Sequence, residues 1–190
     1  MLSRDMSKGD IEKELEGKGE YIQIDLLTNF IEGKPPILMK RHAYTLLAKI
    51  YQKKKMFKDA ARNYESLGII SITFTDKVKY FLIAAEFYIK DGAFEQADYA
   101  MKKAMAEANS FERGEIYHSL KQYYKNQATE FESQGKRNKA SVIYEKILSM
   151  KITHTEEKEI RKKLLDLYEK LGKFKEYSLL EKNGDKSKDT

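Results

Sequence analysis

The side chains that could perform catalysis or hold a metal ion are few and scattered. The three histidines, His42, His118 and His154, lie far apart, and none has a second histidine four residues away or an adjacent carboxylate. Catalysis needs acid–base or nucleophilic groups that converge on one site. The sequence has no cysteine, which excludes disulfides and thiolate metal sites. It also has no glycine-rich phosphate loop after a strand. We therefore expect no enzyme activity, no cofactor and no metal.

Clustered basic residues are the chemical feature that stands out. Basic clusters can meet RNA phosphates, anionic lipid heads or an acidic protein. Lysines also improve solubility and complement the dipole at helix C-termini. The formal net charge is only +6, and no aromatic–arginine stacking motif accompanies the lysines, which favours the second interpretation. The set, called the basic rim below, comprises Lys54, Lys55, Lys58, Lys136, Arg137 and Lys173.

Paired amphipathic helices are the elements that would position these side chains. Between residues 44 and 67, apolar residues recur at the three- and four-residue spacing of a helix face, in two sets separated by a short polar turn. Two helices joined so closely must pack antiparallel. The two faces are Tyr44, Leu47, Ala48 and Tyr51, followed by Ala60, Tyr64 and Leu67.

The same arrangement of aromatic and small residues returns three more times along the chain. The small residue of the second helix recurs at Ala60, Ala97 and Ala140, at intervals of 37 and 43 residues. The aromatic residue near the end of each first helix recurs at Tyr51, Tyr88, Phe131 and Tyr168. Stacked units of this kind bury a continuous core between neighbours. The pattern predicts an all-α solenoid.

This pattern, over roughly residues 39–181, resembles the tetratricopeptide repeat (TPR) family, and its long repeats are similar to those of soluble NSF attachment proteins. The intervals exceed the usual ~34 residues of that repeat. Lys55 and Met56 stand where the family has a glycine turn, and Tyr177 replaces an alanine. The resemblance implies a right-handed superhelix of about four helix pairs, which an N-terminal helix over residues 21–31 would cap.

The resemblance also implies a peptide-binding groove lined by the first helices. Carried onto this chain, the family positions are Thr45, Lys49, Gln52, Leu82, Glu86, Ile89, Lys125 and Thr129. Some TPR co-chaperones hold a terminal carboxylate with a lysine and an asparagine in the first repeat. Here Thr45 and Lys49 occupy those positions, so we do not expect this clamp. The mixed, partly apolar lining suits a helix or an extended peptide, although an ordinary solvated helix face would look the same.

The chain of 190 residues is long enough to bury a core. We expect a flexible segment over residues 1–19, with a short helix over residues 11–15 as an open alternative, a repeat domain over residues 20–182 and a disordered tail over residues 183–190. Gly68 is expected to cap the second helix, and residues 69–74 to form an extended connection. The polar start carries no hydrophobic signal and no run approaches a membrane span, which predicts a cytoplasmic protein.

The favoured function is a non-catalytic scaffold or adaptor that binds a peptide, a helix or a protein complex through the groove. The alternative is a helical repeat that associates with RNA or an acidic partner through the basic rim. A third interpretation is a subunit docked by one end in a larger assembly. The sequence does not identify the partner or the oligomeric state.

Overall fold

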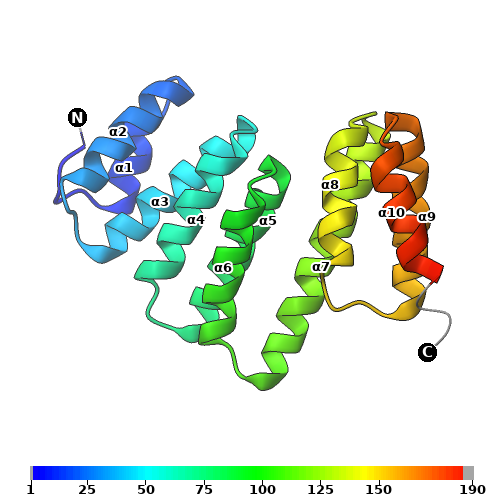
Figure 1. Ribbon diagram of the computed structural model, residues 1–190. Helices are drawn as coiled ribbons and strands as arrows, with labels where there is room; N and C mark the ends of the chain where they lie inside the picture. The colour runs from blue at the N-terminus through cyan, green and yellow to red at the C-terminus, as the bar shows by residue number, and fades with distance from the viewer. Residues whose placement is uncertain (1, 186–190) are drawn as a thin grey trace. The chain divides into compact units, whose positions relative to one another are not determined.

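A computed structural model of the chain, which describes residues 2–185, is entirely helical (Figure 1). Ten helices and no strand occur in this described part. The expectation of an all-α fold is therefore confirmed. The helices are α1 (Lys8–Leu15), α2 (Glu20–Glu32), α3 (Ile37–Lys53), α4 (Phe57–Ile70), α5 (Phe74–Asp91), α6 (Phe94–Glu107), α7 (Ser110–Ser133), α8 (Arg137–Leu148), α9 (His154–Leu171) and α10 (Phe174–Asp185).

The helices form two compact units with a boundary after Tyr117, inside α7. In the first, called unit 1, each helix from α2 to α5 packs against the next helix in the chain. In the second, called unit 2, α8 packs on α9 and α9 on α10. Packing between neighbours in sequence is what a helical repeat requires, because each helix pair buries its apolar face only against the next pair.

The turn inside each predicted helix pair has the same backbone conformation in all four repeats. One residue adopts a left-handed φ, and the next amide donates a hydrogen bond of 2.8 to 2.9 Å to the carbonyl of the recurrent aromatic residue. This is the hydrogen bond of a Schellman cap, which ends a helix abruptly. The left-handed residues are Lys55, Gly92, Gly135 and Gly172, and the accepting carbonyls belong to Tyr51, Tyr88, Phe131 and Tyr168.

Lys55 therefore occupies a glycine position, and Lys55→Gly should stabilise the protein by about 0.5–1 kcal/mol. A side chain at φ 58° crowds its own backbone, whereas glycine adopts this region freely. Urea unfolding followed by circular dichroism measures the difference. Gly92→Ala is the reciprocal control, because a Cβ there meets no atom within 4 Å and only the backbone changes. It should lose about 1 kcal/mol, and a neutral result for both variants would contradict this account of the turn.

A hydrogen bond from a buried tyrosine to a glutamate also occurs twice along the chain. The Tyr88 hydroxyl donates to Glu65 Oε2 at 2.8 Å, and the Tyr168 hydroxyl donates to Glu145 Oε1 at 2.9 Å. In each case the tyrosine belongs to a first helix and the glutamate to the second helix before it. Burial, and then the bond to the carboxylate, raise the pKa of both tyrosines. The recurrence of this bond supports the register of the repeats.

The predicted small residues lie in the buried core. Ala48, Ala60, Ala97 and Ala140 are each 0% exposed. A methyl group at such a position lets two helix backbones approach closely, and a larger side chain would force them apart. The alanine pattern that revealed the repeat is thus a packing requirement of the core.

Two predictions about the connection after α4 are wrong. Gly68 does not cap the helix, because α4 continues to Ile70 and Ser71 follows it. Gly68 is instead buried within α4 against the ring of Phe81 on α5. The connection is also shorter than expected, since α5 begins at Phe74. Close packing between α4 and α5, and not turn formation, explains the glycine.

The packed region extends further towards the N-terminus than the sequence predicted. Residues 8–15 form α1, in which Ile11 is 0% exposed, so the packed region begins well before residue 20. Ser7 caps α1 through a capping box with Asp10. At the other end, the predicted tail over residues 183–190 begins inside α10, which extends to Asp185. Its last five residues lie outside the described part.

Candidate binding cleft

A cleft of about 450 Å³ opens in unit 1 between the first three helices. Apolar side chains from α1 and α3, namely Leu15, Leu46 and Ile50, contribute to its lining. Charged side chains stand beside them, so the cleft offers an apolar surface next to ion-pairing groups. The remaining lining residues are Glu12, Lys13, Glu16, Gln23 and Lys49.

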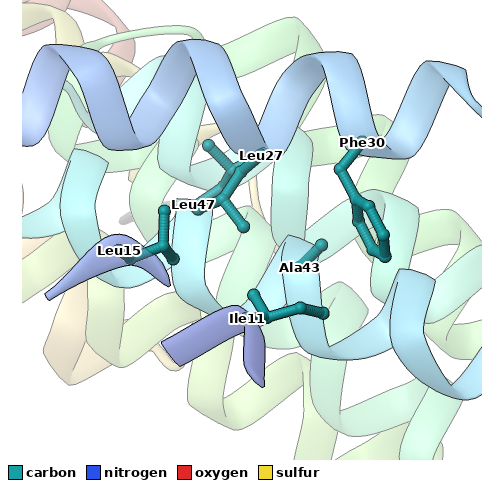
Figure 2. Packing of buried hydrophobic residues seen from close by; sticks show 6 residues of the cluster. All are labelled: Ile11, Leu15, Leu27, Phe30, Ala43 and Leu47. Carbon is teal, nitrogen blue, oxygen red and sulfur yellow. The ribbon is translucent and has the colours of Figure 1, made fainter. Parts of the chain in front are cut away.

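A small hydrophobic core holds the walls of this cleft together (Figure 2). Side chains from the three helices converge on one another, and Leu15 belongs both to this core and to the cleft. Leu46 and Ile50 pack partly against the same core and keep part of their surface accessible. The residues shown in Figure 2 are Ile11, Leu15, Leu27, Phe30, Ala43 and Leu47.

Gln23 fixes the turn that joins α1 to α2. Its Nε2 donates to the carbonyl oxygens of Leu15 at 3.1 Å and Lys18 at 2.8 Å. Both acceptors lie at or just beyond the end of α1, where helical carbonyls lack intrahelical partners. One side chain thereby satisfies the end of α1 and sets the position of one wall of the cleft.

The charge in and beside the cleft is set in part by Lys49, which is exposed, and by His42, which is largely buried. Lys49 is exposed, and it forms no ion pair within the described residues. Nearby, His42 Nε2 lies 3.2 Å from Glu12 Oε1 and the imidazole is largely buried. Burial lowers the pKa of His42, while Glu12 opposes the shift and Lys8 and Lys49 add to it. The imidazole is therefore neutral at neutral pH, and the cations that line the cleft are Lys13 and Lys49.

The predicted groove residues of the first helices divide into accessible and structural positions. Lys49 lines the cleft, and Gln52 is exposed near it on α3. The Thr45 hydroxyl donates to the carbonyl of Arg41 in its own helix at 2.9 Å. On α5, Ile89 is 1% exposed and belongs to the core, so it presents no surface to a ligand.

The other predicted groove residues are mostly engaged within the protein. Glu86 pairs with Lys90 at 2.7 Å, and Leu82 beside it is half-buried. In unit 2, Lys125 Nζ lies 2.7 Å from Glu156 Oε1 on α9, so a charge reversal at Lys125 would disturb folding. Thr129 is exposed, and its hydroxyl donates to the carbonyl of Lys125.

The basic rim differs between the two units. In unit 1, Lys54 Nζ lies 3.9 Å from the centre of the Tyr21 ring and 3.4 Å from Glu20, whose pKa is lowered chiefly by Lys53. Lys55 and Lys58 are exposed. The rim at the start of this unit is thus partly neutralised.

In unit 2 the rim surrounds a second cavity, of about 350 Å³. Gly135, Asn138 and Leu171 line it together with three basic residues, Lys136, Arg137 and Lys139. The first turn of α8 carries no acidic residue. Lys173 lies over the ring of Tyr168 at 5.8 Å. In unit 2, three basic side chains are thus gathered around one cavity.

No protein-family model matches this chain, and no curated protein does. The site must be interpreted from its own residues. Among the described residues, no group of three histidine, aspartate or glutamate side chains could hold a metal ion. No helix in this part of the chain is long and apolar enough to cross a membrane.

The sequence did not reveal that Leu46 and Ile50 line the cleft. They are one helical turn apart on α3, but the repeat pattern assigned no role to them. Ile11 and Leu15 show the same spacing in the segment that was predicted to be flexible. Combined with the capping residues Ser7 and Asp10, that spacing was the available signal for α1.

Proposed function

We propose that this protein is a non-catalytic TPR-like adaptor that binds a peptide or helix of a partner protein through the cleft between α1, α2 and α3. The observation that carries this proposal is the cleft itself, with accessible Leu46 and Ile50 beside the exposed Lys49. Ligand sites typically combine an apolar lining with a few placed polar groups. The proposed fold is the right-handed superhelix of that repeat class. The recurrent Schellman turns support the repetition of the helix pairs.

The partner segment should place apolar side chains against Leu46 and Ile50 and an acidic group near Lys49. A helix laid into a groove anchors itself with apolar side chains three and four residues apart. Leu46 and Ile50, one turn apart on α3, match that repeat. Lys49 lies between them in sequence and can pair with a carboxylate of the bound segment.

A second candidate function is RNA or acidic-partner binding through the basic rim of unit 2. The observation that favours it is the cavity lined by Lys136, Arg137 and Lys139, where the start of α8 lacks an acidic residue. Basic side chains on such a surface attract phosphate groups, and the resulting binding weakens steeply as salt concentration rises.

Matched charge reversals distinguish the two functions. The tagged full chain should capture a defined protein from native lysate, and Lys49→Glu should reduce the yield of that protein by at least about tenfold. Lys136→Glu makes the same charge change in the basic rim, and the adaptor hypothesis expects it to retain the partner. All these positions are exposed, so folding should be unchanged by circular dichroism.

The opposite result would support the second candidate. If Lys136→Glu abolished capture while Lys49→Glu did not, and ribonuclease or moderate salt also released the bound material, the rim would be the binding surface. Capture that is insensitive to both substitutions would contradict both proposals.

A further inference from the structure

Unit 1 exposes six large apolar side chains at one end of its helices. Their exposed fractions range from 48% for Ile37 to 82% for Ile72. Monomeric proteins rarely expose a patch of this kind without a use for it. The set, called the apolar edge below, comprises Ile37, Leu38, Ile69, Ile72, Phe74 and Phe111.

The apolar edge follows three connections between successive helix pairs. Ile37 and Leu38 begin α3, Ile69 to Phe74 span the connection from α4 to α5, and Phe111 begins α7. Within unit 1, the α2–α3, α4–α5 and α6–α7 connections lie at the same end of the helices, the lower end in Figure 1. The α4–α5 connection is the middle one.

Two ion pairs and one hydrogen bond show that these connections are neighbours. Arg41 Nη2 on α3 lies 3.2 Å from Asp76 Oδ2 on α5. Lys77 on α5 lies 3.1 Å from Glu107 at the end of α6. Arg113 Nε on α7 donates to the carbonyl of Met105 on α6 at 3.0 Å. All the residues that make these contacts lie within four positions of a residue of the apolar edge, except Met105, which is near the end of α6. The exposed side chains of the apolar edge therefore belong to one surface.

The same pairs determine the chemistry that this surface can recognise. Four of the charged side chains between the connections form two complete ion pairs inside the protein. The surface therefore has little to attract a phosphate or an acidic peptide, although the chain as a whole carries +6. An apolar, electrically balanced surface can meet an identical surface without the repulsion that two basic faces would experience.

The size of the surface is also that of a stable contact. Phe74 and Phe111, at 68% and 77% exposure, together present on the order of 300 Å². The four aliphatic side chains, each about half exposed or more, add roughly as much again. With the polar atoms between them, the edge approaches the ~800 Å² per partner that a standard specific interface buries.

We propose that the apolar edge of unit 1 binds the same edge of a second copy of this chain and forms a two-fold symmetric dimer. A two-fold contact uses one patch on both copies, so it closes without forming a filament. The middle connection then lies nearest the symmetry axis, and Ile72 faces Ile72 of the other copy. The outer connections, at Leu38 and at Phe111, face each other reciprocally.

Analytical ultracentrifugation of the full chain over a range of concentrations tests this proposal. The wild type should be a reversible dimer. Ile72→Asp should weaken the dimer by at least about tenfold, because a charge would be buried at the centre of the contact. Leu179→Asp, on the exposed face of α10 in unit 2, is the matched control and should leave the dimer unchanged.

Cross-linking gives a second readout that does not depend on affinity. The chain has no cysteine, so Ile72→Cys introduces a single thiol. A short bis-maleimide should convert this variant to a covalent dimer, while Leu179→Cys should give only background. Since Ile72 is 82% exposed, Ile72→Asp and Ile72→Cys should leave the helix content intact. Phe111→Asp tests a second site on the same edge.

Three results would overturn the proposal. One is a wild type that stays monomeric at every concentration. Another is a dimer that Ile72→Asp and Phe111→Asp do not weaken. The third is a monomer that binds phospholipid vesicles through these side chains, since the edge would then serve a membrane surface. The cleft between α1, α2 and α3 does not include these residues, so loss of the dimer and loss of partner binding are separable outcomes.

Discussion

Gly68→Leu should destabilise unit 1 by about 3 kcal/mol or more, and Gly68→Ala by about 1–2 kcal/mol. A Cβ atom at Gly68 would lie 2.7 Å from Cε1 and 2.8 Å from Cδ1 of Phe81. The Phe81 ring is 4% exposed, so it has little freedom to move away. Urea unfolding followed by far-ultraviolet circular dichroism measures the free energy of each variant.

Gly114→Ala is the matched control for this substitution. Gly114 also lies inside a helix, but it is exposed, and a Cβ there meets no atom within 4 Å. Alanine is favoured over glycine in a helix interior by about 0.8–1.0 kcal/mol. The same chemical change should therefore stabilise the protein at Gly114 and destabilise it at Gly68. A gain in stability for Gly68→Ala would show that α4 and α5 are not packed as described.

Features set by nearby residues were predictable from the sequence. The helix pairs followed from the spacing of alanine and aromatic residues. Thr153 and Glu156 stand three residues apart, as a capping box requires, and this box is present at the start of α9. These features depend on contacts within a few residues, where the spacing itself carries the information.

Features set by distant contacts were not predictable. Gly68 follows Leu67, the last residue of the predicted apolar face, which favours a helix cap, and only its contact with Phe81 explains why it is buried. Helix α1 is short and polar, and it depends on the core of Figure 2 that α2 and α3 complete. An isolated helix of that length is marginal in water, so the spacing of Ile11 and Leu15 and the cap at Ser7 could suggest α1 but could not establish that it forms.

The candidate site shows the same division. The position of Lys49 on the first helix was predicted, and the structure places it at the cleft. Lys125 was also predicted to line the groove, at the position that Thr45 occupies in the first repeat, but its partner Glu156 lies 31 residues further along the chain. The repeat pattern assigns both lysines to the lining. It cannot show that one of them is engaged by a particular carboxylate.

Glu156→Ala should destabilise unit 2 by about 2–4 kcal/mol, because this side chain serves two structural purposes. Its carboxylate accepts a hydrogen bond from the Thr153 amide at 2.9 Å, completing the capping box of α9. It also pairs with Lys121 at 2.9 Å and Lys125 at 2.7 Å on α7. Losing a cap costs about 0.5–2 kcal/mol and losing hydrogen bonds between charged groups about 1.5–3 kcal/mol.

Glu156→Gln separates these two contributions. Glutamine can still complete a capping box but carries no charge for the lysines. It should therefore lose less stability than Glu156→Ala, with the remaining loss due to Lys121 and Lys125, which are 14% and 28% exposed. Equal losses for the two variants would assign the whole effect to the ion pairs. A glutamine variant as stable as the wild type would show that the pairs contribute nothing.

The contribution of Glu156 should also depend on pH. Lys125, then the Thr153 amide and Lys121, hold the pKa of this carboxyl far below its ordinary value. The unfolded chain protonates a glutamate near pH ~4.3, so the stabilisation is complete above that pH and declines as the pH falls towards the folded pKa. The gap in unfolding free energy between wild type and Glu156→Gln should consequently be widest at neutral pH and narrow below about pH 4. A gap of constant size from neutral to strongly acidic pH would contradict a carboxylate held ionised by its lysine partners.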